Sequence, residues 1–335
     1  MLYEAAARYR RRHYKRRPDL QRRLSRPVIS IGNLAVGGRA KTPLAALVAS
    51  RLRDLGERPA ILSRGYARRD AADGVVVVRD RHGIRADLDR AGDEPLMLAR
   101  RLDGVAVLAS ASRYLAGRLA EHHFGCTVHV LDDGFQHFAL HRDADLVVIG
   151  RADLQGSSTL PAGRLREAID ATQAADAFVM LDDDTEEALR DLGRPIWRAR
   201  RRQGAARLAD AAGTPIAPSA GPIVAVAGIA HPSGFFEDLK SAGWLIAREL
   251  PYRDHHRYGP GDLAEIAGAA RAAGARLVLT TEKDLVRLLP FRPFAVPIGY
   301  VPMTLEIERP AALDEWLMSI CRGTRTADHA DHADE

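Results

Sequence analysis

A glycine-rich stretch followed by a lysine and a threonine offers the most specific chemistry in the sequence. Residues 32–43 read Gly-Asn-Leu-Ala-Val-Gly-Gly-Arg-Ala-Lys-Thr-Pro, between an apolar run and an amphipathic helical pattern. This order is typical of a phosphate-binding P-loop, in which backbone N–H groups and a helix N-terminus meet a polyphosphate. Lys41 would place its charge on the β- and γ-phosphates, and the Thr42 hydroxyl would bind Mg²⁺. The predicted nucleotide-binding residues are Ala35, Val36, Gly37, Gly38, Arg39, Ala40, Lys41 and Thr42.

The match to the P-loop pattern is imperfect at two positions. Ala40 replaces the glycine that normally precedes the lysine, and Ala35 replaces the first glycine. Alanine has the smallest side chain that could stand there, and an α-region backbone at the start of a helix suits alanine well. We therefore expect the loop to form, with an ordinary glycine-rich turn between a strand and a helix as the alternative.

Acidic residues follow two further segments of the first half. Asp132-Asp133 come directly after the apolar run 128–131, a pattern that favours a carboxylate holding Mg²⁺ opposite Thr42. Asp93-Glu94 stand between Gly92 and Pro95 at a helix start, where capping of the helix is the simpler interpretation. The carboxyl ends of parallel strands are where ligands of α/β proteins bind.

The second half contains two more polar clusters. Asp254-His255-His256 could be a metal pair, but a histidine oriented by a carboxylate and acting as a base, or beside one, is the sharper hypothesis. Thr281-Glu282-Lys283-Asp284 follow an apolar run and most simply cap the next helix.

The elements that must position these residues alternate between short apolar strands and helical patterns. A helix is predicted over Pro43–Leu55, and Val75–Val78 with a turn at 81–83 predicts a hairpin. Unalternated Val, Ile and Leu runs indicate a parallel sheet covered on both faces. The predicted strands are Val28–Ile31, Ala60–Ser63, Val105–Ala109, Val128–Leu131, Leu146–Ile149 and Phe178–Leu181.

A second alternation follows a connection rich in Arg, Ala, Pro and Gly over residues 194–220. Its strands are predicted at Ile223–Val226, Trp244–Leu250 and Leu277–Thr280. The last nine residues read ADHADHADE, for which a disordered solvated end is favoured over a metal-binding tail.

Composition is that of a cytosolic globular protein. The 335 residues, 46% of them hydrophobic, suffice for two cores. Cys126 and Cys321 lack metal spacing and predict inert thiols rather than a disulfide framework. No apolar run is long enough for a membrane-spanning helix, and the N-terminus lacks the apolar core of a signal peptide.

Positive charge is concentrated at the N-terminus. Residues 1–26 contain ten Lys and Arg but two acids, whereas the rest of the chain is about three charges negative. Leu2, Tyr3, Ala6, Tyr9 and Tyr14 are interleaved with these bases at roughly helical spacing. The segment alone is compatible with an anionic membrane surface, a nucleic-acid-binding arm or a solvated helix.

Taken together, the motifs resemble the tetraacyldisaccharide 4′-kinase family, the lipid A kinases of Gram-negative bacteria. The resemblance covers roughly residues 2–305 in the family's order, and DDGFQH with TEKD and GDEP is its most specific part. The chain departs from the family at Ala40 and at Ala67, where glycine is usual. The matching strings are Gly32-Asn33-Leu34, Gly37-Gly38, Lys41-Thr42-Pro43, Ser63-Arg64-Gly65-Tyr66, Gly92-Asp93-Glu94-Pro95, Leu131-Asp132-Asp133-Gly134-Phe135-Gln136-His137, Leu160-Pro161-Ala162-Gly163, Leu165-Arg166-Glu167, Ala227-Gly228-Ile229, Pro232, Phe235-Phe236, Asp254-His255-His256 and Thr281-Glu282-Lys283-Asp284.

The resemblance implies an α/β fold with a P-loop NTPase-like parallel-sheet domain and a smaller α/β/α domain, joined by a two-stranded hinge. Stretches near Pro195–Arg202 and Ala295–Val301 would be the hinge strands, and Pro310–Met318 a helix packing back on a domain. The expected parts are a membrane-surface segment (1–26), a kinase domain (27–194), a hinge connection (195–220), a second domain with the return strand (221–305) and a C-terminal helix with a disordered tail (306–335).

The resemblance also implies the reaction and its setting. The family transfers the γ-phosphate of ATP, with Mg²⁺, to the 4′-hydroxyl of a tetraacyldisaccharide 1-phosphate. This takes place at the cytoplasmic face of the inner membrane, where the enzyme is peripheral. We expect a lipid substrate and an anionic membrane surface as partners, a monomer, and no nucleic acid.

Residue roles follow from the matching positions. Lys41 would hold the phosphates and Asp93 would accept the hydroxyl proton, paired with His255 from the other domain once the cleft closes. The expected Mg²⁺ ligands are Thr42, Asp132 and Glu167. Substrate or phosphate contacts are expected from Arg64, Arg113, Asp133, Gln136 and Arg166.

Two other classes of function remain open at this point. A P-loop ATPase or switch protein would hydrolyse ATP without a lipid acceptor and would not need His255. A degenerate nucleotide-binding relative is conceivable because of Ala40.

Overall fold

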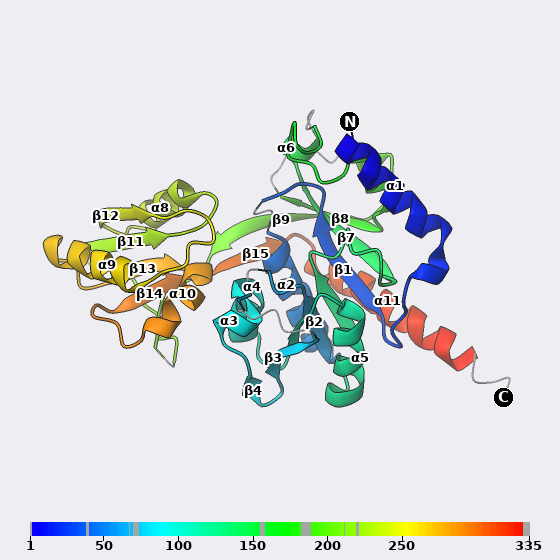
Figure 1. Ribbon diagram of the computed structural model, residues 1–335, viewed down its shortest axis with the longest axis horizontal. Coiled ribbons are helices and arrows are strands. Elements are labelled where there is room, and N and C mark those ends of the chain that lie inside the picture. Colours follow the sequence, from blue (N-terminus) through cyan, green and yellow to red (C-terminus); the bar gives the residue numbers. More distant parts are fainter. Residues whose placement is uncertain are drawn as a thin grey trace. The chain divides into compact units, whose positions relative to one another are not determined.

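The computed structural model describes residues 2–37, 40–66, 68–69, 74–154, 158–181, 189–210, 212–218 and 221–330, without the side chains of Ala152 and of residues 324–330. The chain divides into two compact units, which Figure 1 shows. Unit 1 comprises residues 1–200 and 305–335, and unit 2 comprises residues 201–304.

Unit 1 is built on a sheet in the order β15-β9-β8-β7-β1-β6-β2-β5-β3-β4. The strands from β9 to β5 are parallel, whereas β3 is antiparallel to both β5 and β4. The sheet is therefore mixed but mostly parallel, and the expected hairpin is present. Its strands are β1 (Val28–Asn33), β2 (Pro59–Ser63), β3 (Val76–Asp80), β4 (Gly83–Ile84), β5 (Ala106–Ala109), β6 (Val128–Asp132), β7 (Ala144–Gly150), β8 (Ala177–Leu181), β9 (Ile196–Gln203) and β15 (Met303–Ile307).

Helices cover this sheet and connect its strands. Helix α2 packs on β1, β2 and β6, α5 packs on β2 and β5, and α4 packs on β5. The helical segments of unit 1 are α1 (Leu2–Arg16), η1 (Pro18–Leu20), α2 (Lys41–Asp54), α3 (Leu88–Ala91), α4 (Asp93–Arg101), α5 (Arg113–Phe124), α6 (Arg151–Leu154), η2 (Ile169–Ala174) and α11 (Pro310–Ala330).

The central strand β1 lies between β6 and β7, so the chain turns in opposite directions on its two sides. Ile31 of β1 is in register with Asp132 of β6, which places the acidic end of β6 beside the start of the loop after β1. This is the switch point at which open α/β sheets bind ligands. Gly32 allows a close approach here, since a Cβ would lie 2.3 Å from the Cβ of Phe135.

Unit 2 is a smaller α/β/α layer structure around a sheet in the order β10-β14-β13-β11-β12. Alternate residues of β11 face different cores, Val224 and Val226 on the α9 side and Ile223 and Ala225 on the α8 side. The sheet is parallel except for the β10–β14 pair. Its elements are β10 (Arg207–Leu208), β11 (Ile223–Ala227), α8 (Pro232–Ser241), β12 (Ile246–Pro251), α9 (Pro260–Ala272), β13 (Val278–Thr281), α10 (Glu282–Leu288), η3 (Leu289–Phe291) and β14 (Ile298–Val301).

The return strand differs from the expected one. The stretch Ala295–Val301 contains β14, which is an inner strand of the small sheet, whereas β15 lies beside β9. Glu308 N donates to Arg198 O at 2.9 Å within unit 1, and Gly204 N donates to Pro302 O at 2.8 Å within unit 2. The chain passes between the units along β9 and near the start of β15.

The terminal helix α11 packs against α2 of unit 1 and continues to Ala330, beyond the expected end at Met318. Trp316 lies against Trp197 with ring centroids 5.4 Å apart. Arg51 of α2 pairs with Asp314. Residues 331–335, the end of the repeat tail, lie outside the described residues.

Two expectations about sulfur and membranes can be compared with the structure. Cys126 and Cys321 are both buried and neither forms a disulfide. Burial raises the pKa of the Cys126 thiol to about 12, which agrees with an inert thiol. Among the described residues, no helix combines the length and the apolar character needed to cross a bilayer.

Candidate active site

The glycine-rich loop is held in place by a second segment of the chain. Val36 N donates to Arg164 O at 2.8 Å, Arg166 N donates to Leu34 O at 2.6 Å, and Ala35 forms a bridge with Leu165. The motif at residues 160–167 therefore holds the first half of the glycine-rich loop in place, a structural role that the sequence did not predict. Gly37 has a φ of 101°, which favours glycine. Gly38 and Arg39, two of the predicted nucleotide-binding residues, lie outside the described residues.

Lys41 and Thr42 occupy the first turn of α2. The Lys41 ammonium donates to Asn33 Oδ1 at 3.0 Å and lies 3.3 Å from Asp133 Oδ1. The Thr42 hydroxyl lies 3.4 Å from both carboxylate oxygens of Asp132. The structure thus brings the Lys-Thr pair and the two acids after β6 together, as the strand order predicts.

Asp132 is a buried carboxylate in an acidic surrounding. Burial, Glu94 and Asp133 raise its pKa to about 7, in that order of importance, while Lys41 and the Thr42 hydroxyl act in the opposite direction. A divalent cation beside this carboxylate would offset the unfavourable charge.

Asp133 has the opposite character. Its own burial favours the neutral acid, but Lys41 and Arg166 outweigh it and hold the pKa of this carboxyl below the usual range. Arg166 donates to its two oxygens at 2.9 and 2.8 Å. Arg166, expected as a substrate or phosphate contact, therefore has an ion-pair partner within the site.

Asp93 is the first residue of α4 and is 4% exposed. Its Oδ1 accepts from Glu94 N at 2.9 Å. Helix α4 packs against β5 and α2, and the charge of Glu94 raises the pKa of Asp132. A carboxylate at a helix N-terminus is stabilised in its ionised form.

Cationic side chains gather next to these acids. Arg113, at the start of α5, is buried, and burial, followed by the charge of Arg64, lowers its pKa to about 10. Its Nε has no hydrogen-bond partner among the described residues. Burial and then Arg113 lower the pKa of His137 to about 4, so this imidazole is neutral at pH 7. The exposed Arg64 contributes to the same positive electrostatic potential around His137, which favours binding of an anion.

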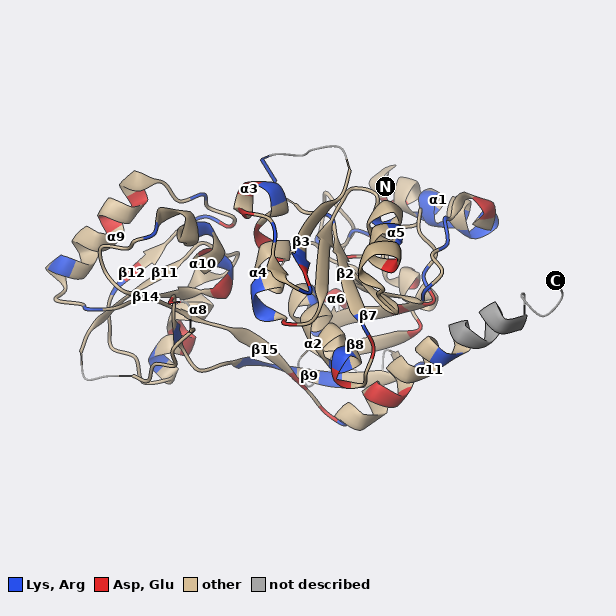
Figure 2. Cartoon of the chain, turned by 90° about the horizontal axis from the view of Figure 1, so that it is seen from below, with Lys and Arg blue, Asp and Glu red and all other residues tan. Residues whose placement is uncertain are grey.

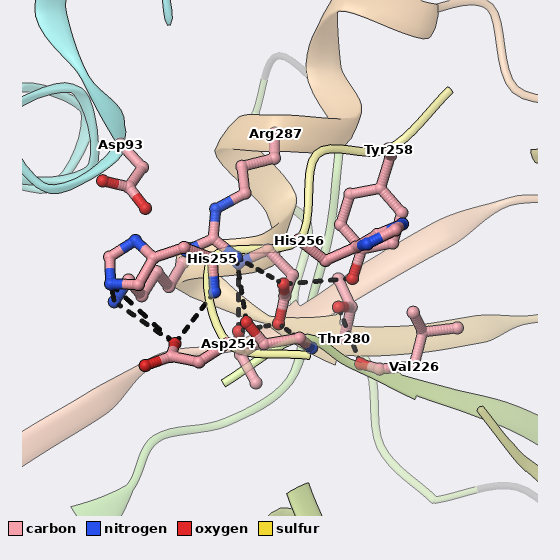
Figure 3. A network of polar contacts seen from close by, with 12 residues as sticks. Asp93, Val226, Asp254, His255, His256, Tyr258, Thr280 and Arg287 are labelled. Carbon is pink, nitrogen blue, oxygen red and sulfur yellow. Dashed lines mark hydrogen bonds and ion pairs between the residues drawn. The ribbon is translucent and has the colours of Figure 1, made fainter. Parts of the chain in front are cut away.

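In unit 2, His255 follows β12 in a left-handed backbone conformation with a φ of 55°. The Lys283 ammonium lies 3.0 Å from His255 Nε2, and the carboxylate of Asp254 accepts from His255 N at 3.0 Å (Figure 3). Because an ammonium can only donate, His255 Nε2 is the acceptor in this contact. His256 instead is half-buried, stacks on Tyr252 with ring centroids 4.6 Å apart and lies 3.2 Å from Asp262.

The buried carboxylate of Asp284 holds the segment around His255 in place through hydrogen bonds. It is fully buried and accepts from Tyr258 Oη at 3.0 Å, Arg287 Nη1 at 3.0 Å and Gly228 N at 3.0 Å, in the network that Figure 3 shows. The four-residue motif at 281–284 therefore does more than cap α10, since Lys283 also contacts the histidine. Among the described residues, no group of three or more His, Cys, Asp or Glu side chains could hold a metal ion on its own.

Glu167 has other partners than a metal. Both of its oxygens accept from the Arg11 guanidinium, at 2.7 and 2.7 Å, and Oε2 also accepts from Gln136 Nε2 at 3.1 Å. Gln136 donates to Asn33 O as well, at 3.0 Å. Arg11 lies outside the matching motifs, whereas Asn33 and Lys283 lie within them but had no predicted role in the site.

The residues present suit a nucleotide and a divalent cation. A hydroxyl and a buried carboxylate 3.4 Å apart offer hard oxygen ligands, and a lysine follows a loop whose backbone leads into a helix N-terminus. The buried Nδ2 of Asn33, beside Lys41, has no hydrogen-bond partner among the described residues. Fold and site together define a P-loop phosphotransferase.

Comparisons with known proteins identify the family. The family model for LpxK, tetraacyldisaccharide-1-P 4′-kinase, matches residues 1–322. A tetraacyldisaccharide 4′-kinase of Geobacter sulfurreducens is 38% identical over 318 residues, which cover 93% of this chain and 89% of the relative. One from Anaeromyxobacter dehalogenans is 43% identical over 283 residues, covering 80% and 74% of the two chains. A crystal structure of LpxK from Aquifex aeolicus in complex with ATP superposes with a TM-score of 0.79 at 30% identity, covering 95% of this chain and 96% of that one.

The chain belongs to the tetraacyldisaccharide 4′-kinase family, the kinases of lipid A biosynthesis. The predicted family, fold class and enzyme class are confirmed. ATP binding is established for the Aquifex aeolicus relative.

The backbone at Ala40 differs from the expectation. Ala40 precedes α2 with φ 55° and ψ 23°, in the left-handed region rather than the right-handed helical region that suits alanine. A Cβ in this region costs roughly 1–2 kcal/mol relative to the right-handed conformation, a cost that glycine avoids. The described residues on either side, 35–37 and 41–42, keep the order of strand, turn and helix in spite of this strain.

We predict that Ala40→Gly stabilises the protein by about 1 kcal/mol and leaves ATP affinity equal or improved within about tenfold. Thermal unfolding and calorimetric titration with ATP–Mg²⁺ measure the two effects. Arg309→Gly is the matched control, because Arg309 has a similar φ of 53° far along the chain from the loop. It should raise stability without changing ATP affinity. Restoration of ATP binding by Ala40→Gly to an otherwise non-binding protein would identify a degenerate kinase.

Proposed function

We propose that this chain transfers the γ-phosphate of ATP to the 4′-hydroxyl of a tetraacyldisaccharide 1-phosphate, with the site around Lys41, Thr42 and Asp132 holding the nucleotide. The observation that carries the proposal is the convergence of a P-loop lysine, a hydroxyl and two carboxylates at the switch point of the large sheet. Family membership supplies the acceptor class.

Mg²⁺ would be held by the Thr42 hydroxyl and the Asp132 carboxylate, which lie 3.4 Å apart. Bound there, the ion would neutralise charge on the β- and γ-phosphate oxygens. Glu167 was expected as a third ligand, but we leave it out because the Arg11 guanidinium already compensates its charge.

The remaining roles belong to the protein's own side chains. Lys41 would bind the phosphates, with Asn33 and Asp133 directing its ammonium. Asp93 would accept the proton of the acceptor's 4′-hydroxyl. The hydroxyl oxygen would bond to the γ-phosphorus as the bond between this phosphorus and the bridging β–γ oxygen breaks, leaving ADP. Arg113 and Arg64 supply positive charge for an anionic group of the acceptor or the nucleotide.

His255 would pair with Asp93 and orient it. With Nε2 accepting from Lys283, Nδ1 of the ring would carry the proton and offer a donor to a carboxylate. The two residues lie in different units, and their pairing is a proposal about the reacting enzyme. Because transfer would need residues of both units, hydrolysis of ATP by water would be limited.

The experiment that tests the function is incubation with γ-labelled ATP, Mg²⁺ and tetraacyldisaccharide 1-phosphate in neutral detergent. We expect labelled lipid, and a loss on the order of 10²-fold or more in Lys41→Ala because transition-state charge loses its lysine. Lys240→Ala, which removes an exposed lysine paired with Glu249, is the control and should retain full rate. A wild-type rate in folded Lys41→Ala would exclude the P-loop assignment, and ATP hydrolysis without labelled lipid would favour an ATPase or switch.

For the pair, we predict that Asp93→Asn and His255→Ala each lower kcat more than they change the KM for ATP, because both act in the transition state. The double variant should lose less than the product of the two single losses. Steady-state kinetics on the four proteins measures this. Asp89→Asn, an exposed acid on α3, should behave as wild type. Fully multiplicative losses would contradict the pairing.

We also propose that α1 binds an anionic membrane surface as part of a peripheral, monomeric enzyme at the cytoplasmic face of the inner membrane. Figure 2 shows Lys and Arg along α1, and its exposed residues include apolar and aromatic side chains, with Leu2 90% and Tyr9 70% exposed. A basic helix of this kind suits anionic lipid headgroups.

Binding to vesicles that contain phosphatidylglycerol should therefore weaken as salt rises, because screening reduces attraction to the bases of α1. Co-sedimentation at increasing NaCl measures it, with phosphatidylcholine vesicles as the control. Equal binding to both vesicle types would argue against the electrostatic contribution, and preferential binding to DNA would favour a nucleic-acid-binding arm.

A further inference from the structure

One side of α1 faces the body of unit 1 rather than solvent. Five of its six half-buried residues, at positions 4, 7, 8, 11 and 14, lie on one face of the helix, and the sixth is His13. Arg11 lies in the middle of this face. Its side chain is 17% exposed, and its Nε and Nη2 donate to the two oxygens of Glu167 at 2.7 Å each.

Arg11 is also stacked on aromatic rings of the segment after β6. Its guanidinium carbon lies 4.3 Å from the ring centroid of Phe135 and 4.9 Å from that of Phe138. A bidentate pair with a carboxylate that is 5% exposed, together with two rings, fixes this side chain in one orientation.

Two routes lead from Arg11 to the strand that carries the phosphate loop. Glu167 accepts from Gln136, Gln136 donates to Asn33 O, and Asn33 Oδ1 accepts from the Lys41 ammonium at 3.0 Å. The second route is through Phe135, whose Cβ leaves room for no more than a glycine at position 32. Both routes therefore end on residues 32–33, immediately before the loop.

We propose that Arg11 is a positioning residue for phosphoryl transfer, which couples the docking of the membrane-facing helix to the geometry of Lys41. The inference rests on the proposed kinase site. When α1 leaves unit 1, the buried Glu167 carboxylate loses the Arg11 guanidinium that compensates its charge. Gln136, which donates to Glu167 and to Asn33 O, is then no longer held in one orientation. The exposed face of α1 can contact lipid while this face stays on the enzyme.

The neighbouring Arg8 provides the contrast. It pairs with Asp170 at 2.7 Å and with Glu4 at 3.0 Å, but these side chains are 35–47% exposed, so both pairs are screened by solvent. It occupies the same face of the same helix and carries the same charge. Among the described contacts, none leads from Arg8 to Gln136, Asn33 or Lys41.

The test compares Arg11→Gln with Arg8→Gln in neutral detergent micelles, where no anionic surface is present. We expect Arg11→Gln to lower kcat about tenfold and to weaken ATP binding several-fold by calorimetry, and Arg8→Gln to leave both unchanged. The Arg8 side chain is 41% exposed and open to lipid, whereas Arg11 is paired with Glu167, so Arg8→Gln should weaken binding to phosphatidylglycerol vesicles at least as much as Arg11→Gln. A lower kcat in Arg11→Gln without a larger loss of vesicle binding separates positioning from membrane attraction.

Two further variants guard against simple unfolding. Arg11→Lys retains the charge but not the bidentate geometry and should recover part of the rate. Arg11→Gln with Glu167→Gln removes the unpaired charge, and its loss should not exceed that of Arg11→Gln alone. Wild-type kcat and ATP affinity in Arg11→Gln, or equal losses in Arg8→Gln, would overturn the inference. If wild-type protein labels no lipid, the proposed function fails, whereas the ATP titrations still decide the role of Arg11.

Discussion

Two adjacent carboxylates at the end of a buried strand impose the main electrostatic constraint on this site. Asp132, 3% exposed, ends β6, and Asp133, whose side chain is 37% exposed, follows it directly, so two like charges lie side by side and need compensation. Asp133 receives it from Lys41 and Arg166, which hold its pKa low. For Asp132, burial, Glu94 and Asp133 outweigh Lys41 and the Thr42 hydroxyl, so its pKa stays raised. The protein thus completes one charge pair itself and leaves the other for a cation.

Backbone strain is concentrated at the same residues. Among described residues other than glycine, positive φ values occur at Ala40, Asp133, His255 and Arg309. Three of these belong to the proposed site, and surrounding contacts stabilise each conformation: the hydrogen bond from Leu44 N to Ala40 O, the ion pairs of Asp133, and the Asp254 and Lys283 contacts of His255. Strained residues persist where surrounding structure determines them, and they gather where chemistry needs a fixed direction.

The strand and helix order could be predicted because it is local. Periodicity alone located β1, α2 and β6, and their order placed Thr42 opposite Asp132. The return strand could not be predicted in this way. Residues 298–301 and 303–307 both have the composition of a strand, and only pairing with distant partners decides that the second lies beside β9. The predicted right-handed helical conformation of Ala40 was wrong for a related reason. Helix propensity describes residues inside the helix, whereas Ala40 is the cap that precedes it.

The N-terminal helix shows most clearly what sequence patterns leave undecided. Its bases are so numerous that they occupy every face, and no pattern distinguishes Arg11 from Arg10 or Arg12. The distinction comes from a carboxylate 156 residues away in sequence, whose burial makes the choice of partner energetically important. Glu167, which the motif indicated as a metal ligand, is thereby used to attach the helix. The charge count that indicates a membrane surface therefore includes at least one base whose partner is the enzyme itself, so counts of basic residues overestimate the charge available to lipid.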